Sequence, residues 1–92
     1  MSQEPYRLCD RSGTSYARHA DVNTDQMMKA FGKPNVSCAD EEQGYEHEWS
    51  FEGTNGRPFA VYDRYGIYRI GAETGCPPDE VKNFYDWIQS KI

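Results

Sequence analysis

The segment from residue 45 to 52 alternates between ring-bearing and polar side chains at every position. The ring-bearing members are Tyr45, His47, Trp49 and Phe51, and the polar members are Glu46, Glu48, Ser50 and Glu52. A period of two is typical of a β-strand that buries one face and keeps the other in water. The segment therefore predicts a strand whose aromatic face needs a second layer of structure to cover it.

Two further strands are predicted directly after this one. Residues 53–56 contain an Asn-Gly turn signal, and the apolar run 59–62 follows them. Polar residues 63–66 then separate this run from the next strand, 67–70. Because Pro58 has no amide hydrogen to donate, we expect it at the start of its strand or on an unpaired side. The pattern predicts an antiparallel meander of three or more strands.

Two segments have the signals of amphipathic helices. Residues 24–31 begin with a capping residue and an acid, place Met27, Met28 and Phe31 on one stripe, and end at Gly and Pro. Residues 77–92 begin with two prolines and two acids, which suit a helix N-terminus. Apolar side chains recur at helical spacing in this segment: Val81, Phe84, Tyr85, Ile88 and Ile92.

The first 44 residues contain weaker signals apart from the helix at 24–31. Residues 6–9 and 15–18 each suit a short strand with a Ser-Gly turn between them, so we predict a hairpin. Residues 35–44 contain turn formers and three consecutive acids, which indicates a loop. The expected fold of residues 1–92 is one small α+β domain of two layers. In it the C-terminal helix covers the aromatic face of the meander, and a short helix in the N-terminal half packs beside it.

Aromatic side chains must supply much of the core. Only 13 of the 92 residues are Leu, Ile, Val or Phe, but there are seven Tyr and two Trp, each able to bury about 150 to 250 Å². Since Tyr and Trp are also enriched at the centres of protein interfaces, we expect some of them to face a partner. A chain of this size has no room for separate cofactor and substrate domains, so we expect a binding protein that uses no cofactor and is not an enzyme.

Acidic side chains are concentrated in the middle of the chain. Residues 35–56 include six acids and no Lys or Arg, so this segment has charge -6 while the whole chain has -5. The six are Asp40, Glu41, Glu42, Glu46, Glu48 and Glu52. On a strand the last three project from one side at about 6.6 Å per two residues, close to the roughly 6 to 7 Å between phosphates along a nucleic acid. We expect the six to form a partner-binding surface that attracts a Lys/Arg groove, and the alternative is a solvated sheet face that maintains solubility.

Other site chemistry has less support in the sequence. The acids at 40–42 lack the alternating ligand positions and the Gly of a calcium-binding loop, so we expect no metal. Cys9, Cys38 and Cys76 lack metal-binding or redox spacing and suit reduced thiols. A nucleophilic pair of Cys38 or Cys76 with His47 is a minor alternative, which no recognised catalytic motif accompanies.

Arg57, Arg64 and Arg69 lie among the aromatic residues of the meander. Such a mixture suits base stacking, but a pI of about 4.9 disfavours a general nucleic-acid binder. We therefore expect these Arg side chains on the wet face of the sheet, paired across strands with Glu46 or Glu48.

The second half of the chain combines sheet aromatics with turn glycines in a longer pattern. Its elements are Trp49-x-Phe51, Gly56-x-x-Phe59-x-x-Tyr62-Asp63 and Tyr68-x-x-Gly71, followed by a short helix. Over residues 45–92 this pattern resembles small proteins encoded by phages and prophages, in particular the anti-CRISPR inhibitors. The resemblance implies an inhibitor that binds a bacterial RNA-guided CRISPR effector complex, its acidic surface blocking a basic nucleic-acid-binding groove. It supplies no binding motif residue by residue.

An accessory or scaffold protein is the alternative function. Such a protein would bind through exposed aromatic residues, with Tyr65 at a hairpin tip and Trp87 on the edge of the last helix as anchors. In both cases the expected partner is a host protein or ribonucleoprotein complex, without sequence-specific contact to nucleic acid, and the chain is a monomer or weak dimer. No apolar run reaches the roughly 18 residues of a membrane span and no signal-peptide pattern is present, so we expect a place in the host bacterial cytoplasm.

Overall fold

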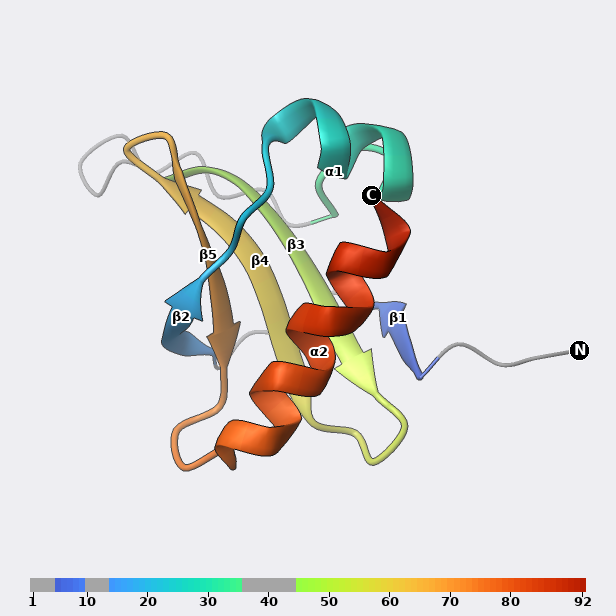
Figure 1. Cartoon of the computed structure of the whole chain (residues 1–92), viewed down its shortest axis with the longest axis vertical. Helices are drawn as coiled ribbons and strands as arrows, with labels where there is room; N and C mark the ends of the chain where they lie inside the picture. The colour runs from blue at the N-terminus through green and yellow to red at the C-terminus, as the bar shows by residue number, and fades with distance from the viewer. Residues whose placement is uncertain (1–4, 10–13, 36–44) are drawn as a thin grey trace, which may run out of the picture.

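The computed structural model describes residues 5–9, 14–35 and 45–92, without the side chains of Tyr45 and Glu46. In these ranges five antiparallel strands form one sheet in the order β1-β3-β4-β5-β2 (Figure 1). The strands are β1 (Tyr6–Leu8), β2 (Ser15–His19), β3 (Tyr45–Gly53), β4 (Pro58–Arg64) and β5 (Ile67–Ala72), and the helices are α1 (Thr24–Phe31) and α2 (Pro78–Lys91). The predicted α+β fold of two layers is confirmed.

The meander β3-β4-β5 is confirmed, with a tighter second turn than predicted. β4 begins at Pro58, where the missing amide hydrogen is tolerated. Its pairing with β5 continues through Asp63 and Arg64, so only two residues form the turn. These are Tyr65 and Gly66, with φ of 53° and 78°. Two positive φ values are typical of the two-residue hairpin loop that matches the twist of the strands.

The hairpin predicted for the N-terminal segment is wrong, although both of its strands exist. β1 pairs with β3 at one edge of the sheet, and β2 pairs with β5 at the other edge. An isolated two-stranded hairpin buries little surface, whereas each of these short strands gains a preformed partner and part of the core by joining the meander. The β2–β5 pairing contains a bulge between Tyr16 and Arg18.

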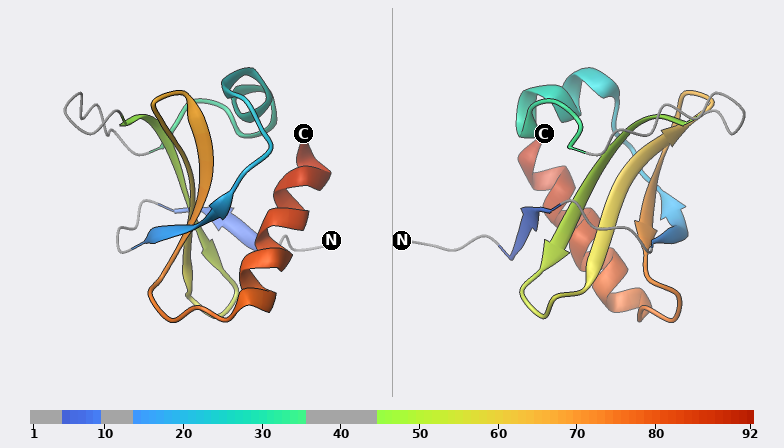
Figure 2. Two further views of the ribbon diagram at one scale, coloured as in Figure 1. Left: turned by 60° about the vertical axis from the view of Figure 1, so that its left-hand side comes forward. Right: turned by 180° about the vertical axis from the view of Figure 1, so that it is seen from behind.

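Within the described residues, both helices lie on one face of the sheet and none covers the other face, which we call the helix-free face (Figure 2). The apolar stripe predicted for the C-terminal helix is largely confirmed, since Val81, Phe84 and Ile88 are buried while Ile92 is 37% exposed. The ring of Phe84 stacks on that of Phe59, with centroids 4.7 Å apart. The largest fully buried side chains are Trp49, Phe51, Phe59, Phe84, Met27, Ile70, Ile88 and Val61. The aromatic face of β3 is thus covered by α2 as predicted, and Tyr45 lies outside the described side chains.

The helix predicted at residues 24–31 is confirmed, but its N-cap is Asn23 and not Thr24, the first residue of the predicted segment. The Asn23 side chain accepts a hydrogen bond from the Gln26 amide at 2.8 Å, and the Gln26 side chain accepts one from the Asn23 amide at 3.0 Å. This reciprocal capping box satisfies two amides at the helix start. Met27 is fully buried, but Met28 is 36% exposed, so the predicted stripe was wrong for Met28.

Candidate functional site

Strand pairing determines which side chains share the helix-free face of the sheet. Glu48 lies opposite Tyr62, Tyr62 lies opposite Arg69, and Arg69 lies opposite His19. Directly opposed residues of paired strands point to the same face. These four side chains therefore form one row across β3, β4, β5 and β2.

The next row along the strands is made of small residues covered by larger ones. Ser50, Ala60 and Gly71 are opposed across β3, β4 and β5, and both Ser50 and Ala60 are fully buried. A Cβ atom at Gly71 would lie 3.2 Å from the Tyr62 ring and 2.9 Å from Thr14 Oγ1. Gly71 thus leaves the space that the Tyr62 ring occupies beside it.

Exposed apolar side chains flank this row at the β4–β5 turn and on β2. Tyr65 is 69% exposed, Ile67 is 48% exposed and Tyr16 is 53% exposed. Arg64 lies opposite Ile67, and its guanidinium is 5.9 Å from the centre of the Tyr65 ring. Since alternate residues of a strand share a face, Arg64 and Ile67 adjoin the row that contains Arg69.

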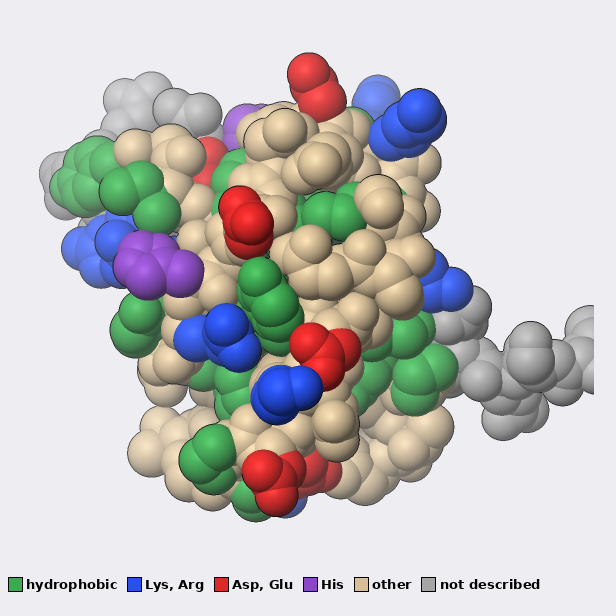
Figure 3. Space-filling model, viewed as in Figure 1, with side chains coloured by type: hydrophobic (Ala, Val, Ile, Leu, Met, Phe, Trp, Pro, Cys, Tyr) green, Lys and Arg blue, Asp and Glu red, His purple; other side chains and the backbone are tan. Residues whose placement is uncertain are grey.

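We call this surface the tip patch. It comprises Tyr16, His19, Arg64, Tyr65, Ile67 and Arg69. The Arg69 guanidinium lies 5.4 Å from the centre of the Tyr16 ring, and the rings of Tyr16 and His19 meet edge to face at 6.2 Å. In Figure 3 hydrophobic, basic and histidine side chains lie side by side at the side of the molecule where the β4–β5 hairpin ends. Tyr65 therefore lies at an exposed hairpin tip, beside the Arg64 guanidinium.

The acidic surface expected from the sequence is only partly within the described residues. Asp40, Glu41, Glu42 and the side chain of Glu46 lie outside them. Glu48 and Glu52 face the helix-free side, opposite Tyr62 and Pro58.

The described part of the helix-free face also contains basic groups. Glu52 forms an ion pair with Arg7, Oε2 to Nη2, at 3.0 Å. The hydrogen bond that Arg7 donates to this carboxylate, and then the charge of the carboxylate, raise the pKa of Arg7 above its ordinary value. Since Arg69 lies in the same row as Glu48, with Tyr62 between them, this part of the face is mixed in charge.

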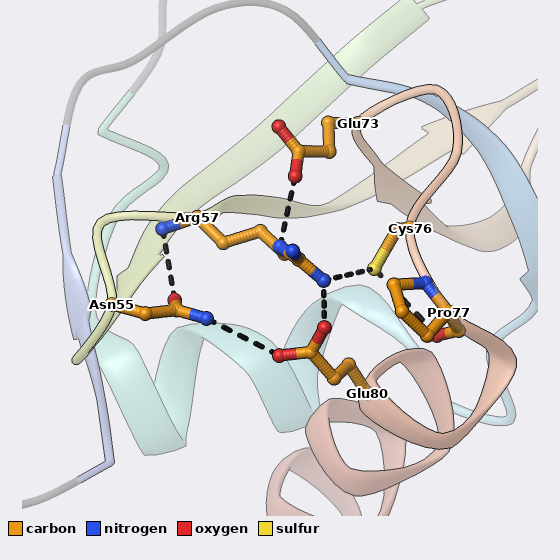
Figure 4. Close-up of polar contacts among 6 residues, drawn as sticks. All are labelled: Asn55, Arg57, Glu73, Cys76, Pro77 and Glu80. Carbon is orange, nitrogen blue, oxygen red and sulfur yellow. Dashed lines mark hydrogen bonds and ion pairs between the residues drawn. The ribbon is translucent and has the colours of Figure 1, made fainter.

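Arg57 does not pair with the acids of β3, which corrects the expectation for this residue. Its Nε lies 2.8 Å from Glu73 Oε1, and its Nη1 forms a second ion pair with Glu80. Asn55 donates to Glu80 at 3.2 Å and accepts from the Arg57 amide at 3.1 Å. Figure 4 shows this Arg57 cluster joining the β3–β4 hairpin to the start of α2. The arrangement anchors the helix on the sheet.

The structure does not bring His47 together with Cys76. The His47 amide donates to Asp63 Oδ1 at 2.7 Å, near the end of β4, and the His47 ring stacks on Trp49. Cys76 Sγ lies 3.7 Å from Nη1 of Arg57, and Arg57 is the residue directly before β4. The length of β4 therefore separates the two groups, and Cys38 lies outside the described residues.

Trp87 is half-buried, unlike the exposed anchor expected from the sequence. Its ring centre lies 5.2 Å from that of Tyr6, 5.6 Å from that of Phe31 and 5.7 Å from that of Phe51. Lys91 covers the ring from outside, with Nζ at 5.6 Å. Trp87 thus serves the packing of α2 on the sheet.

Comparisons with protein-family profiles, with curated proteins and with solved structures give no match for this chain. Within the described ranges no three His, Cys, Asp or Glu side chains come together as metal ligands would. No helix in those ranges is both long enough and apolar enough to span a bilayer.

The sequence identified Tyr65 as a site residue but not its neighbours on β2. Tyr16 and His19 reach the patch only because β2 pairs with β5, about 50 residues later in the chain. The alternation of Arg64, Ile67 and Arg69 with buried residues was the one local signal for the rest of the patch.

Proposed function

We propose that this domain binds a partner protein through the tip patch, with Tyr65 and Ile67 as its apolar anchors. The observation that supports the proposal is the 69% exposure of Tyr65 at a two-residue hairpin turn. A tyrosine in such a turn gains nothing from the core, and its φ of 53° is unfavourable for a residue with a side chain. Exposed Tyr with adjacent Arg is the composition of interface hot spots.

The charges of the tip patch specify the chemistry of its partner. Arg64 and Arg69 lie on either side of the apolar anchors. The complementary surface is an apolar pocket that accepts Tyr65 and has Asp or Glu at its rim. Because the anchors are apolar, this binding is expected to persist at high salt.

An acidic inhibitor is the second candidate, favoured by the common orientation of Glu48 and Glu52 on the helix-free face. In this account the phage-encoded protein acts in the host cytoplasm as a monomer or weak dimer. Its acidic row, with the residues at 40–42 and 46, blocks a basic nucleic-acid-binding groove of a CRISPR effector complex. This binding depends on charge and is expected to weaken strongly with salt.

The two accounts are separated by capture from a bacterial lysate that contains CRISPR effectors, at about 100 mM and about 500 mM salt. Four baits are compared: the wild type, the double variant Tyr65→Asn with Ile67→Thr, the variant with Glu41, Glu42, Glu46 and Glu48 changed to Lys, and Met28→Gln. Asn tolerates positive φ, so Tyr65→Asn keeps the β4–β5 turn. Met28→Gln is the matched control, because Met28 is an exposed apolar residue on α1.

The proposal predicts a protein retained at both salt concentrations by the wild type and by Met28→Gln, and lost with the Tyr65/Ile67 variant. A protein retained only at low salt, and lost only with the Lys variant, would instead support the acidic inhibitor. Retention of the same protein by all four baits would contradict both accounts.

A further inference from the structure

A groove runs along β2 on the helix side of the sheet. Its volume is about 750 Å³, and every residue of β2 lines it. Ala72 and Val81 are the buried apolar residues of its lining, and loop residues 73–76 close one end. Figure 1 shows β2 at the outer edge of the sheet, with the loop and the first turn of α2 beside it.

The shape of this groove suits an extended chain. Five consecutive residues of one strand line it, which at about 3.3 Å per residue is roughly 16 Å of strand. β2 is an edge strand, and within the described residues its only strand partner is β5. The main-chain groups on its outer side therefore offer a template for one more strand.

The charges of the groove favour an acidic occupant. Arg18 and Lys82 both line it, and the Arg18 guanidinium is held 4.0 Å above the Tyr85 ring. Glu73 is the acid among these lining residues, and its carboxylate is engaged by Arg57 at 2.8 Å. Lys82 pairs with Asp86 at 2.8 Å, but both side chains are more than half exposed, so a competing carboxylate can replace this partner at low cost.

A second copy of this chain fits the groove less well than an acidic segment. Pairing β2 with its own copy would bring two Arg18 side chains into one short interface, where like charges repel. A short acidic strand meets no such repulsion.

We infer that the groove between β2 and α2 binds an acidic segment of a partner protein, added to the sheet as a strand beside β2. Carboxylates of the segment lie against Arg18 and Lys82, and its apolar side chains lie over Ala72 and Val81. Tyr16 and His19 belong both to the tip patch and to the lining of the groove, but the anchors Tyr65 and Ile67 do not line it. The inference therefore does not depend on the function proposed above.

The test is a titration of the ¹⁵N-labelled protein followed by its amide NMR signals. The probes are a seven-residue peptide of alternating Glu and Val, a peptide of alternating Lys and Val, the Glu/Val peptide with N-methyl groups on alternate amides, and inorganic phosphate. We expect saturable shifts at residues 15–19 with the Glu/Val peptide, half complete below about 1 mM. The N-methylated peptide keeps the charge but loses strand hydrogen bonds, and its affinity should fall at least about tenfold.

Two charge variants and a control complete the test. Lys82→Gln and Arg18→Gln should each weaken binding of the Glu/Val peptide about three- to tenfold, whereas Lys29→Gln on α1 should leave it unchanged. Lys82 is exposed, so its variant remains informative if loss of the Arg18–Tyr85 contact disturbs folding. The inference is overturned if the Glu/Val peptide leaves residues 15–19 unshifted. It is also overturned if the Lys/Val peptide, the N-methylated peptide or phosphate produces the same shifts with equal affinity.

Discussion

The side-chain amide of Asn35 hydrogen-bonds both main-chain groups of Ser50. Asn35 Oδ1 accepts from the Ser50 amide at 2.8 Å, and Asn35 Nδ2 donates to the Ser50 carbonyl at 3.1 Å. β1 ends at Leu8, one residue before the Cys9 amide donates to the same carbonyl at 2.9 Å. Asn35 therefore continues the hydrogen bonding of the short edge strand and closes the edge of β3.

Asn35→Ala is expected to destabilise the fold by about 1 to 3 kcal/mol, because the amide of the fully buried Ser50 loses the Asn35 acceptor, whereas the Ser50 carbonyl still accepts from Cys9. Asn35→Asp keeps the acceptor and loses the donor, so its cost should be smaller. Asn83→Ala, at an exposed position of α2, is the control and should change stability by less than about 0.5 kcal/mol. Urea unfolding measures all three, and equal midpoints for Asn35→Ala and Asn83→Ala would show that this amide has no structural role.

The Arg57 cluster predicts a second contrast between two arginines. Arg57→Gln removes the cation between Glu73 and Glu80, and should cost about 1 to 2 kcal/mol because both carboxylates then lie close together. Arg7→Gln removes an ion pair whose Arg is 77% exposed, and we expect no measurable change. The thermal unfolding midpoints of Arg57→Gln, Arg7→Gln and the wild type, at low and at high salt, measure this difference in stability. If Arg7→Gln costs as much as Arg57→Gln, the cluster has no special part in anchoring α2.

The pKa of Tyr6 predicts the behaviour of the protein in alkali. Burial of Tyr6 and, second, the charge of Cys76 raise the pKa of Tyr6 above the ordinary value of 10.0. The unfolded chain thus releases this proton at lower pH than the folded protein. The resulting stabilisation is complete below about pH 10 and is lost as the pH rises through the pKa of folded Tyr6.

Tyr6→Phe removes this titration but keeps the edge contacts with Phe59 and Phe84. Between about pH 9 and about pH 11, the wild type should therefore lose more stability than the variant. Urea midpoints at both pH values give the comparison. Parallel losses in the two proteins would mean that burial of this hydroxyl does not couple to folding.

The sheet and α2 could be predicted from sequence because their signals are local. The alternation at residues 45–52 and the stripe of Val81, Phe84 and Ile88 each follow from the period of one element. The places of β1 and β2 could not be predicted in this way, since each strand is only three to five residues long. Their partners are decided by which edges of the meander remain open, a property of the whole sheet.

The candidate site, too, could be predicted only where its signals are local. Tyr65 was predicted from the turn in its own segment, but Tyr16 joins it only through the pairing of β2 with β5. The partners of Arg57 were also predicted wrongly, because Glu73 and Glu80 approach it only once the β5–α2 loop folds back. Opposite charges do pair across strands, but the two acids that lie next to Arg57 are not on β3.

The most direct test of the tip patch is a calorimetric titration of the captured partner with the wild type, Tyr65→Asn and Met28→Gln at about 500 mM salt. Removal of a hot-spot tyrosine costs about 2 kcal/mol or more, so Tyr65→Asn should bind at least about 30-fold more weakly. Met28→Gln should bind as the wild type does. Equal affinity of Tyr65→Asn and the wild type would contradict the proposal that this domain binds its partner through the β4–β5 tip.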